Sequence, residues 1–185
     1  MPAWRVRTPL HRVVQVLKRH RDVMFAADAD DKPPSSLITT LAARAYAGQT
    51  DLLTATLEVV EAMPGLIERR GDRYWVENPV CDGENFADKW NDYPQRRRKF
   101  IGWYEQVARD LEGTLHEHRG APAVHDRLKK AFGTDPVVKA IGVIGDQSRR
   151  LRESGGLQVA TRGLLTEGAG RPVRDHRFFG GPAPA

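Results

Sequence analysis

The fold is decided first by one stretch near the start of the chain, Arg7-Thr8-Pro9-Leu10-His11-Arg12-Val13-Val14-Gln15-Val16-Leu17-Lys18-Arg19-His20-Arg21-Asp22. Thr8 followed by Pro9 predicts a helix start, because threonine can cap the first turn and proline there lacks only an N–H that has no helical partner. Apolar residues then recur at helical spacing. They are Leu10, Val13, Val14, Leu17 and Met24. A second flank of this helix is polar and is centred on Lys18.

Two further helices are predicted directly after the first. Residues 26–34 read as a loop with an acidic cluster and a double proline. Ser35 or Ser36 can cap the helix that follows, which runs to about residue 46. A third helix is predicted over 51–63. Three helices joined by short links are typical of a compact helical lobe.

The pattern changes at residues 67–76, where Gly71-Asp72 between two short alternating segments predicts a β-hairpin. From residue 147 onward glycine, arginine and proline dominate, which is typical of a linker or a partly ordered tail. We therefore predict a mainly α chain with one small β-hairpin, divided into a helical lobe at 1–146 and a tail at 147–185. Further helices are predicted at 94–118, 121–132 and 137–144.

Composition excludes several classes of protein. The chain has 185 residues, of which 40% are hydrophobic, and this supports a packed core. No apolar run approaches the roughly 20 residues of a membrane span, and the start does not read as a secretory signal. The single cysteine, Cys81, excludes an internal disulfide and an all-cysteine metal site. We expect a cytoplasmic protein without membrane partners.

The net charge of +5 is distributed unevenly, with two basic ends around an acidic middle. Such ends suit either phosphate-bearing partners or simple solvation. The basic run Arg96-Arg97-Arg98-Lys99 is interpreted as a solvated helix face, because no interleaved aromatic residues favour nucleic-acid binding. Gly-rich phosphate loops, zinc spacings and nucleophile elbows are absent from the sequence. His116 and His118 lie two residues apart, so they face away from each other on a helix.

Four stretches occur in a distinctive order. They are residues 7–22 quoted above, Lys32-Pro33-Pro34-Ser35-Ser36-Leu37-Ile38-Thr39-Thr40-Leu41-Ala42-Ala43, Glu84-Asn85-Phe86-Ala87-Asp88-Lys89-Trp90 and His176-Arg177-Phe178-Phe179-Gly180. In this order they resemble the C-terminal half of bacterial CD-NTases, which are SMODS-type nucleotidyltransferases. These enzymes make cyclic oligonucleotides in CBASS antiphage defence and are related to cyclic GMP-AMP synthase and oligoadenylate synthetase.

The resemblance implies a two-lobed enzyme. Its N-terminal lobe would carry a Gly-Ser turn and three carboxylates that bind two Mg²⁺ ions, and its helical C-terminal lobe would close the nucleotide cleft. This sequence has no Gly-Ser followed by Asp-x-Asp, and Asp28-Ala29-Asp30 falls in a loop between helices. We therefore expect this chain to correspond to the second lobe, without catalytic residues, without a metal of its own and inactive by itself.

The resemblance also assigns contacts with the donor triphosphate to Lys18 and Ser35, with Ser36 as a weaker neighbour. A lysine ammonium suits phosphate oxygens, and a serine at a helix N-terminus adds a hydroxyl beside free N–H groups. Arg21 and Lys32 are expected to be solvated charges at the rim. The implied partners are nucleoside triphosphates of the ATP/GTP class, the N-terminal lobe and CBASS accessory proteins, with nucleic acid not expected.

Two interpretations of the whole chain stay open at this point. One is the nucleotide-holding lobe just described, and the other is a non-catalytic helical module that binds phosphate or nucleic acid. Residues 84–90 are expected to have a structural role, with Phe86 and Trp90 buried on one side and with Asn85 and Asp88 bonded to nearby backbone. The resemblance allows residues 176–180 to dock onto the lobe, and a mobile tail is the alternative.

Overall fold

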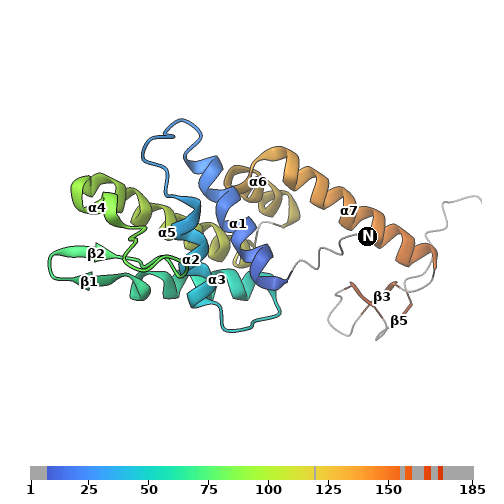
Figure 1. Ribbon diagram of the computed structural model, residues 1–185. Helices are drawn as coiled ribbons and strands as arrows, with labels where there is room; N and C mark the ends of the chain where they lie inside the picture. Colours follow the sequence, from blue (N-terminus) through green and yellow to red (C-terminus); the bar gives the residue numbers. More distant parts are fainter. Residues whose placement is uncertain (1–7, 119, 155–156, 160–164, 168–170, 173–185) are drawn as a thin grey trace, which may run out of the picture. The chain divides into compact units, whose positions relative to one another are not determined.

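A computed structural model describes residues 8–118, 120–154, 157–159, 165–167 and 171–172. The chain divides after Val137 into two compact units. The predicted mainly α fold with one hairpin is confirmed for the first unit (Figure 1). Its elements are α1 (Pro9–Met24), α2 (Ser35–Ala45), α3 (Leu52–Ala62), the 3₁₀ turn η1 (Met63–Leu66), β1 (Glu68–Arg70), β2 (Arg73–Trp75), α4 (Asp88–Asp92), α5 (Pro94–Leu115) and α6 (Ala121–Phe132).

Helix α1 begins as predicted. The side chain of Thr8 accepts a hydrogen bond from the backbone N–H of His11, and Pro9 is the first helical residue. Two of the predicted apolar positions, Val13 and Leu17, are fully buried, whereas Met24 is 45% exposed. The predicted stripe is therefore correct up to Leu17 and wrong at Met24, because the neighbouring Phe25 and not Met24 packs into the core at the end of α1.

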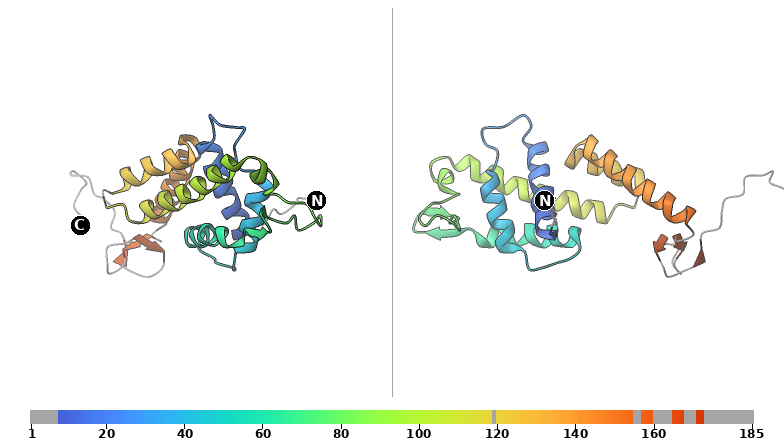
Figure 2. Two further views of the ribbon diagram at one scale, coloured as in Figure 1. Left: turned by 90° about the vertical axis from the view of Figure 1, so that its left-hand side faces the viewer. Right: turned by 45° about the vertical axis from the view of Figure 1, so that its right-hand side comes forward.

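The core of the first unit lies where α1, α2, α3 and α5 meet (Figures 1 and 2). Helix α5 is the long element that α1 crosses, and Phe100 and Trp103 on α5 are fully buried. Burying an aromatic side chain of this size contributes a few kcal/mol of folding free energy. Other fully buried apolar residues are Leu37, Ile38, Leu41, Ala42, Ala55, Val59, Met63, Val76 and Val107.

The start of α2 differs from the prediction. Neither Ser35 nor Ser36 is the capping residue: Pro34 is the N-cap, and the side chains provide no cap hydrogen bond. Ser35 is the first helical residue. The proline adopts extended backbone angles that any cap position requires, and it leaves the first N–H groups of α2 without a capping side chain.

The hairpin is antiparallel, with Arg70 paired to Arg73 across a two-residue turn. Gly71 has a φ of 60°, while no non-glycine residue in the described part of the chain has a positive φ. This is the pattern of a type II′ turn, which needs glycine at its first central position. The predicted hairpin is therefore confirmed.

Asparagine side chains anchor the hairpin to the rest of the lobe. Asn85 accepts hydrogen bonds from the backbone N–H groups of Val76 and Ala87, both at 2.9 Å, and donates to the carbonyl of Tyr74 at 2.8 Å. Asn91 accepts from the Tyr74 N–H at 2.8 Å. The predicted structural role of Asn85 is confirmed. In contrast, Asp88 forms an ion pair with Arg73 at 2.6 Å instead of bonding to backbone.

Residue 90 is buried as predicted, since Trp90 is 4% exposed and packs against Phe100 with ring centroids 5.0 Å apart. Phe86 is half-buried against the same core. Helix α4 begins only at Asp88, so the two aromatic residues do not share a helical turn. Residues 176–180, the predicted docking segment, lie outside the described residues.

The end of the chain carries more regular structure than the sequence predicted. Helix α7 (Thr134–Glu153) is longer than the predicted helix at 137–144 and runs past residue 147. Gly142 and Gly145 lie inside α7, since a glycine lowers helix propensity by only about 1 kcal/mol and does not by itself end a helix. The second unit also holds a three-stranded antiparallel sheet in the order β4-β3-β5. Its strands are β3 (Leu157–Val159), β4 (Leu165–Glu167) and β5 (Arg171–Pro172).

Within the part of the chain that the structure describes, every helix is too short or too polar to cross a membrane.

Candidate functional site

A buried arginine organises the junction between α1 and α2. Arg21 is 6% exposed, and its guanidinium donates to the carbonyl of Pro33 at 3.1 Å and to the hydroxyl of Ser35 at 2.7 Å. It also donates twice to one carboxylate oxygen of Asp22, at 3.0 and 2.7 Å. The expectation that Arg21 is a solvated rim charge is therefore wrong, because the chain folds back over it and supplies its acceptors.

Asp22 holds a second cation in the same place. The Nζ atom of Lys32 lies 3.5 Å from the Asp22 carboxylate, so Lys32 is also paired and not simply solvated. Partial burial acts to raise the pKa of Asp22, but hydrogen bonds from Arg21 and the charges of Arg21 and Lys32 outweigh it and lower the pKa. The carboxylate is therefore held ionised between two cations.

Lys18 lies one turn before Arg21 on α1 and is half-buried. Among the described residues, its side-chain ammonium forms no hydrogen bond and no ion pair. The ammonium of Lys18 is therefore not neutralised by this part of the chain, unlike the neighbouring charges of Arg21 and Lys32. A cation in this state can take an anionic ligand at little cost, since no internal partner has to be displaced.

Ser35 and Ser36 are exposed at the start of α2. The structure brings Ser35 to Arg21, not directly to Lys18. No acidic residue lies in the first turn of α2, so the positive end of the helix dipole is not offset there. The start of α2 thus presents the hydroxyl of Ser35 and N–H groups without a capping side chain, and Lys18 lies one turn before Arg21 on the neighbouring helix.

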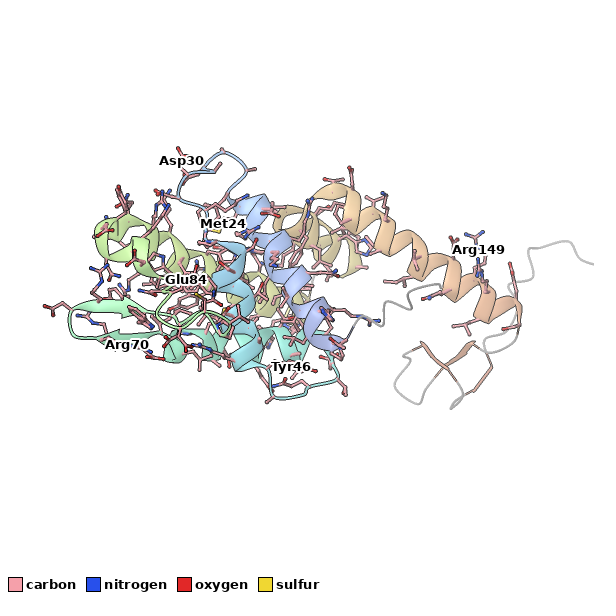
Figure 3. All side chains as sticks on the ribbon, in the orientation of Figure 1. Met24, Asp30, Tyr46, Arg70, Glu84 and Arg149 are labelled. Carbon is pink, nitrogen blue, oxygen red and sulfur yellow. The ribbon has the colours of Figure 1, made fainter. Side chains whose placement is uncertain are left out.

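Ser36 belongs to a neighbouring pocket of about 550 Å³. Its walls come from the loop before α2, from residues 83–90 and from the start of α5 (Figure 3 labels Glu84 in this segment). Aromatic side chains and charges of both signs line it: Trp75, Phe86, Trp90, Asp31, Lys32 and Arg96. The pocket has the size and mixed lining of a small-molecule site, and neither Lys18 nor Ser35 lines it.

The acidic loop between α1 and α2 does not form a metal site. Asp28 is paired with Lys99, and Asp31 lies 3.4 Å from Arg96, while Asp30 is exposed in this loop (Figure 3). The hydrogen bond from Lys99 is the main cause of the lowered pKa of Asp28. In the described residues, no group of three His, Cys, Asp or Glu side chains could hold a metal ion. The carboxylates of Asp28 and Asp31 are paired with protein cations, so they do not fit a Mg²⁺ site.

The basic run at the start of α5 is not a uniformly solvated face. Arg96 and Lys99 bind the acidic loop, as described above. Arg97 turns the other way, and its guanidinium carbon lies 4.3 Å from the ring centre of Tyr74 in the hairpin. The predicted solvated face is therefore wrong for Arg96 and Arg97, which are half-buried, whereas Arg98 and Lys99 are exposed. The aromatic partner of Arg97 comes from a strand that is distant in sequence.

Over most of its length the chain is similar to two proteins whose names describe them as cyclic dinucleotide synthases. The chain is 28% identical over 177 residues to a c-di-GMP synthase of Roseivirga ehrenbergii, a match that covers 93% of this chain and 46% of that protein. It is 24% identical over 182 residues to the cyclic dinucleotide synthase CdnG of Bradyrhizobium diazoefficiens, with 90% of this chain and 44% of that protein covered. No protein-family model matches the chain.

These matches support the predicted relationship to CD-NTases. The chain spans less than half the length of the two relatives that it matches.

Sequence reasoning missed Arg21 as the residue that ties α1 to α2. The signal was weak, since Arg21 lies among four other basic residues within 12–21. Its burial and its contacts with Pro33 and Ser35 could be recognised only with α2 in place.

Proposed function

We propose that this chain is the nucleotide-holding part of a nucleotidyltransferase that joins nucleoside triphosphates into a cyclic oligonucleotide. The observation that carries the proposal is the junction of α1 and α2, where the Lys18 ammonium has no partner among the described residues while Arg21 fixes the start of α2. The names of the two matched relatives, both cyclic dinucleotide synthases by those names, support the same class of reaction.

In this proposal each group has a defined task. The ammonium of Lys18 binds phosphate oxygens of the donor triphosphate, and the hydroxyl of Ser35 and the first N–H groups of α2 bind further oxygens. Arg21 positions Ser35 and does not itself contact the ligand. The pocket of about 550 Å³ beside Ser36 has room for the remainder of the nucleotide.

The proposal extends to the part of the enzyme that would perform the chemistry. By its resemblance to CD-NTases, the chain corresponds to the C-terminal half, and the carboxylates that bind Mg²⁺ belong to the N-terminal half. The metal would activate the attacking hydroxyl and stabilise the leaving pyrophosphate. The same resemblance places the product in CBASS antiphage signalling with its accessory proteins.

Calorimetric titration of the chain with ATP and GTP tests the proposal. Lys18→Gln removes one charge-assisted contact, worth about 1.5–3 kcal/mol, so we expect affinity to fall by roughly 10-fold to 150-fold. Ser35→Ala removes a weaker neutral contact and should cost about 3-fold to 10-fold. Lys130→Gln is the matched control, since Lys130 is an exposed lysine on α6. This variant should bind ATP and GTP with the wild-type affinity.

Two results would contradict the proposal. One is equal affinity of the Lys18→Gln variant and the wild type for both nucleotides. The other is tighter binding of a single-stranded oligonucleotide than of ATP or GTP at the same phosphate concentration, which would favour a nucleic-acid module instead.

A further inference from the structure

A second pocket lies on the other side of Trp90, between the hairpin and the start of α5. Its volume is about 500 Å³, and its polar lining includes Arg73, Arg97 and Arg98. Among the described residues, Trp90 is the one lining residue that it shares with the pocket beside Ser36, and none of the residues assigned to the triphosphate lines it. Figure 3 shows Arg70 on the hairpin that forms one wall of this region.

The charges that line this pocket do not cancel. Arg73 is bound to Asp88 at 2.6 Å, and Asp72 is nearest to Arg69, at 4.0 Å. Within the described part of the chain, Arg97 and Arg98 have no carboxylate partner. Three guanidinium groups and one carboxylate line the pocket, so an excess of positive charge remains for a ligand to neutralise.

Arg97 is held in place before any ligand arrives. Its guanidinium carbon lies 4.3 Å from the ring centre of Tyr74, a distance typical of a cation–π contact. Asn91 in turn fixes the backbone of Tyr74, accepting from its N–H at 2.8 Å and donating to its carbonyl at 3.2 Å. A guanidinium held in this way loses little conformational entropy on binding an anion.

The start of α5 adds to the positive potential. Pro94 is the first residue of this helix of 22 residues, and neither a capping side chain nor an acidic residue in the first turn offsets its dipole. Arg97 and Arg98 therefore meet no intrahelical carboxylate at this end.

The aromatic side chains here are not free to stack on a base. The ring of Tyr74 contacts the guanidinium groups of both Arg97 and Arg69, at 4.3 and 4.6 Å, and Trp90 is only 4% exposed. Base recognition usually relies on an exposed aromatic face. The pocket therefore favours the phosphate groups of a ligand over its base.

We propose that this pocket is a second anion site, which binds a small di- or triphosphate through Arg97 and Arg98 without reading a base. This pocket is separate from the triphosphate site proposed at the α1–α2 junction, and either proposal can be wrong without the other. A guanidinium pair suits this ligand because each group offers parallel N–H donors to phosphate oxygens.

The test is an NMR titration of the isotope-labelled full chain with sodium pyrophosphate. We expect the backbone amides of Arg97 and Arg98 to shift in a saturable way. The double variant Arg97→Gln/Arg98→Gln should weaken this binding at least tenfold. Arg98→Gln alone should weaken it severalfold, and since Arg98 holds no aromatic ring, this variant leaves the hairpin contacts intact.

Two controls separate the sites. Arg109→Gln removes an exposed arginine farther along α5 and should leave the pyrophosphate affinity within twofold. Lys18→Gln should leave the shifts of Arg97 and Arg98 unchanged even where it abolishes nucleotide binding.

The proposal is wrong if pyrophosphate leaves both amides unshifted, or if the double variant binds it as tightly as the wild type. It is also wrong if a single-stranded oligonucleotide at equal phosphate concentration binds these residues tenfold more tightly than pyrophosphate, since the partner would then be a nucleic acid.

Discussion

Two arginine-rich junctions of this lobe use the same side chain in opposite ways. At the α1–α2 junction, Arg21 is 6% exposed and directs its donors to protein acceptors. At the junction of the hairpin with α5, Arg97 is half-buried and contacts a ring face, which leaves its N–H groups without a carboxylate in the described part of the chain. Burial forces a guanidinium to find internal acceptors, whereas partial exposure leaves its donors to water or a ligand. The first arginine therefore maintains structure, and the second is suited to binding.

Replacing each arginine in turn tests whether Arg21 and Arg97 differ in their contribution to stability. Arg21→Met leaves Ser35, Pro33 and Asp22 without their shared donor, so we expect the free energy of unfolding to fall by about 2–3 kcal/mol. Arg97→Met removes one cation–π contact and should cost about 0.5–1 kcal/mol. Urea denaturation of both variants measures the difference. Equal losses would show that the two arginines do not differ in structural role.

Loss of the hydrogen bonds that attach the hairpin should cause the next largest decrease in the free energy of unfolding. Asn85→Ala removes three hydrogen bonds to backbone groups of Tyr74, Val76 and Ala87, and we expect a loss of about 2 kcal/mol in unfolding free energy. Asn85→Asp keeps the acceptor oxygen and loses only the donor to Tyr74, so it should cost less. If Asn85→Ala unfolds at the wild-type urea midpoint, the hairpin is held by packing alone.

The α1 side of the lobe should also respond to acid. His20 is 2% exposed, and its Nε2 atom lies 3.1 Å from a carboxylate oxygen of Asp110. Burial lowers the pKa of His20 below 6.5, although the hydrogen bond and charge of Asp110 act to raise it. The unfolded chain therefore takes up a proton near pH 6.5 that the folded chain resists.

It follows that His20 contributes stability above pH 6.5 and that this contribution is lost as the pH falls below 6.5 towards the lowered pKa. We expect urea midpoints measured between pH 7.5 and 5 to decrease for the wild type. His20→Phe should flatten this decrease, because it removes the titrating ring and keeps an aromatic of similar size. An NMR titration that gives His20 a pKa above 6.5 would reverse the sign and refute the prediction.

The smallest effect is expected at the acidic loop. Asp28→Asn removes the ion pair with Lys99, which is exposed to solvent and to screening by salt. We expect no measurable change in the thermal midpoint at 0.15 M salt. A clear destabilisation would mean that the loop holds α5 in place, and that an exposed ion pair can be as important for stability as the buried Arg21.

Apart from the short α4, the sequence predicted the helices of the first unit and the hairpin because their signals are local. Thr8 and Pro9 set the start of α1 through contacts within one turn, and Gly71 permits the hairpin turn by its own backbone freedom. The end of α7 was missed because a helix boundary without proline has only weak local signals.

The candidate site was predicted in part. Lys18 and Ser35 came from a resemblance and not from residue chemistry, and the chain gave no local reason to separate Arg21 from the other basic residues around it. Arg97 was likewise read with its three neighbours, although those neighbours face two different parts of the lobe.

The sequence by itself determined where helices begin, which faces of them are apolar, and that the chain carries many cations near Lys18 and Arg97. Only the tertiary structure decided which of these cations are neutralised. That outcome depends on acceptors supplied from distant segments, such as Pro33 for Arg21 and Tyr74 for Arg97. The residue type fixes the charge of a side chain, but the packing of the whole lobe sets which group pairs with that side chain and how far it is exposed to water.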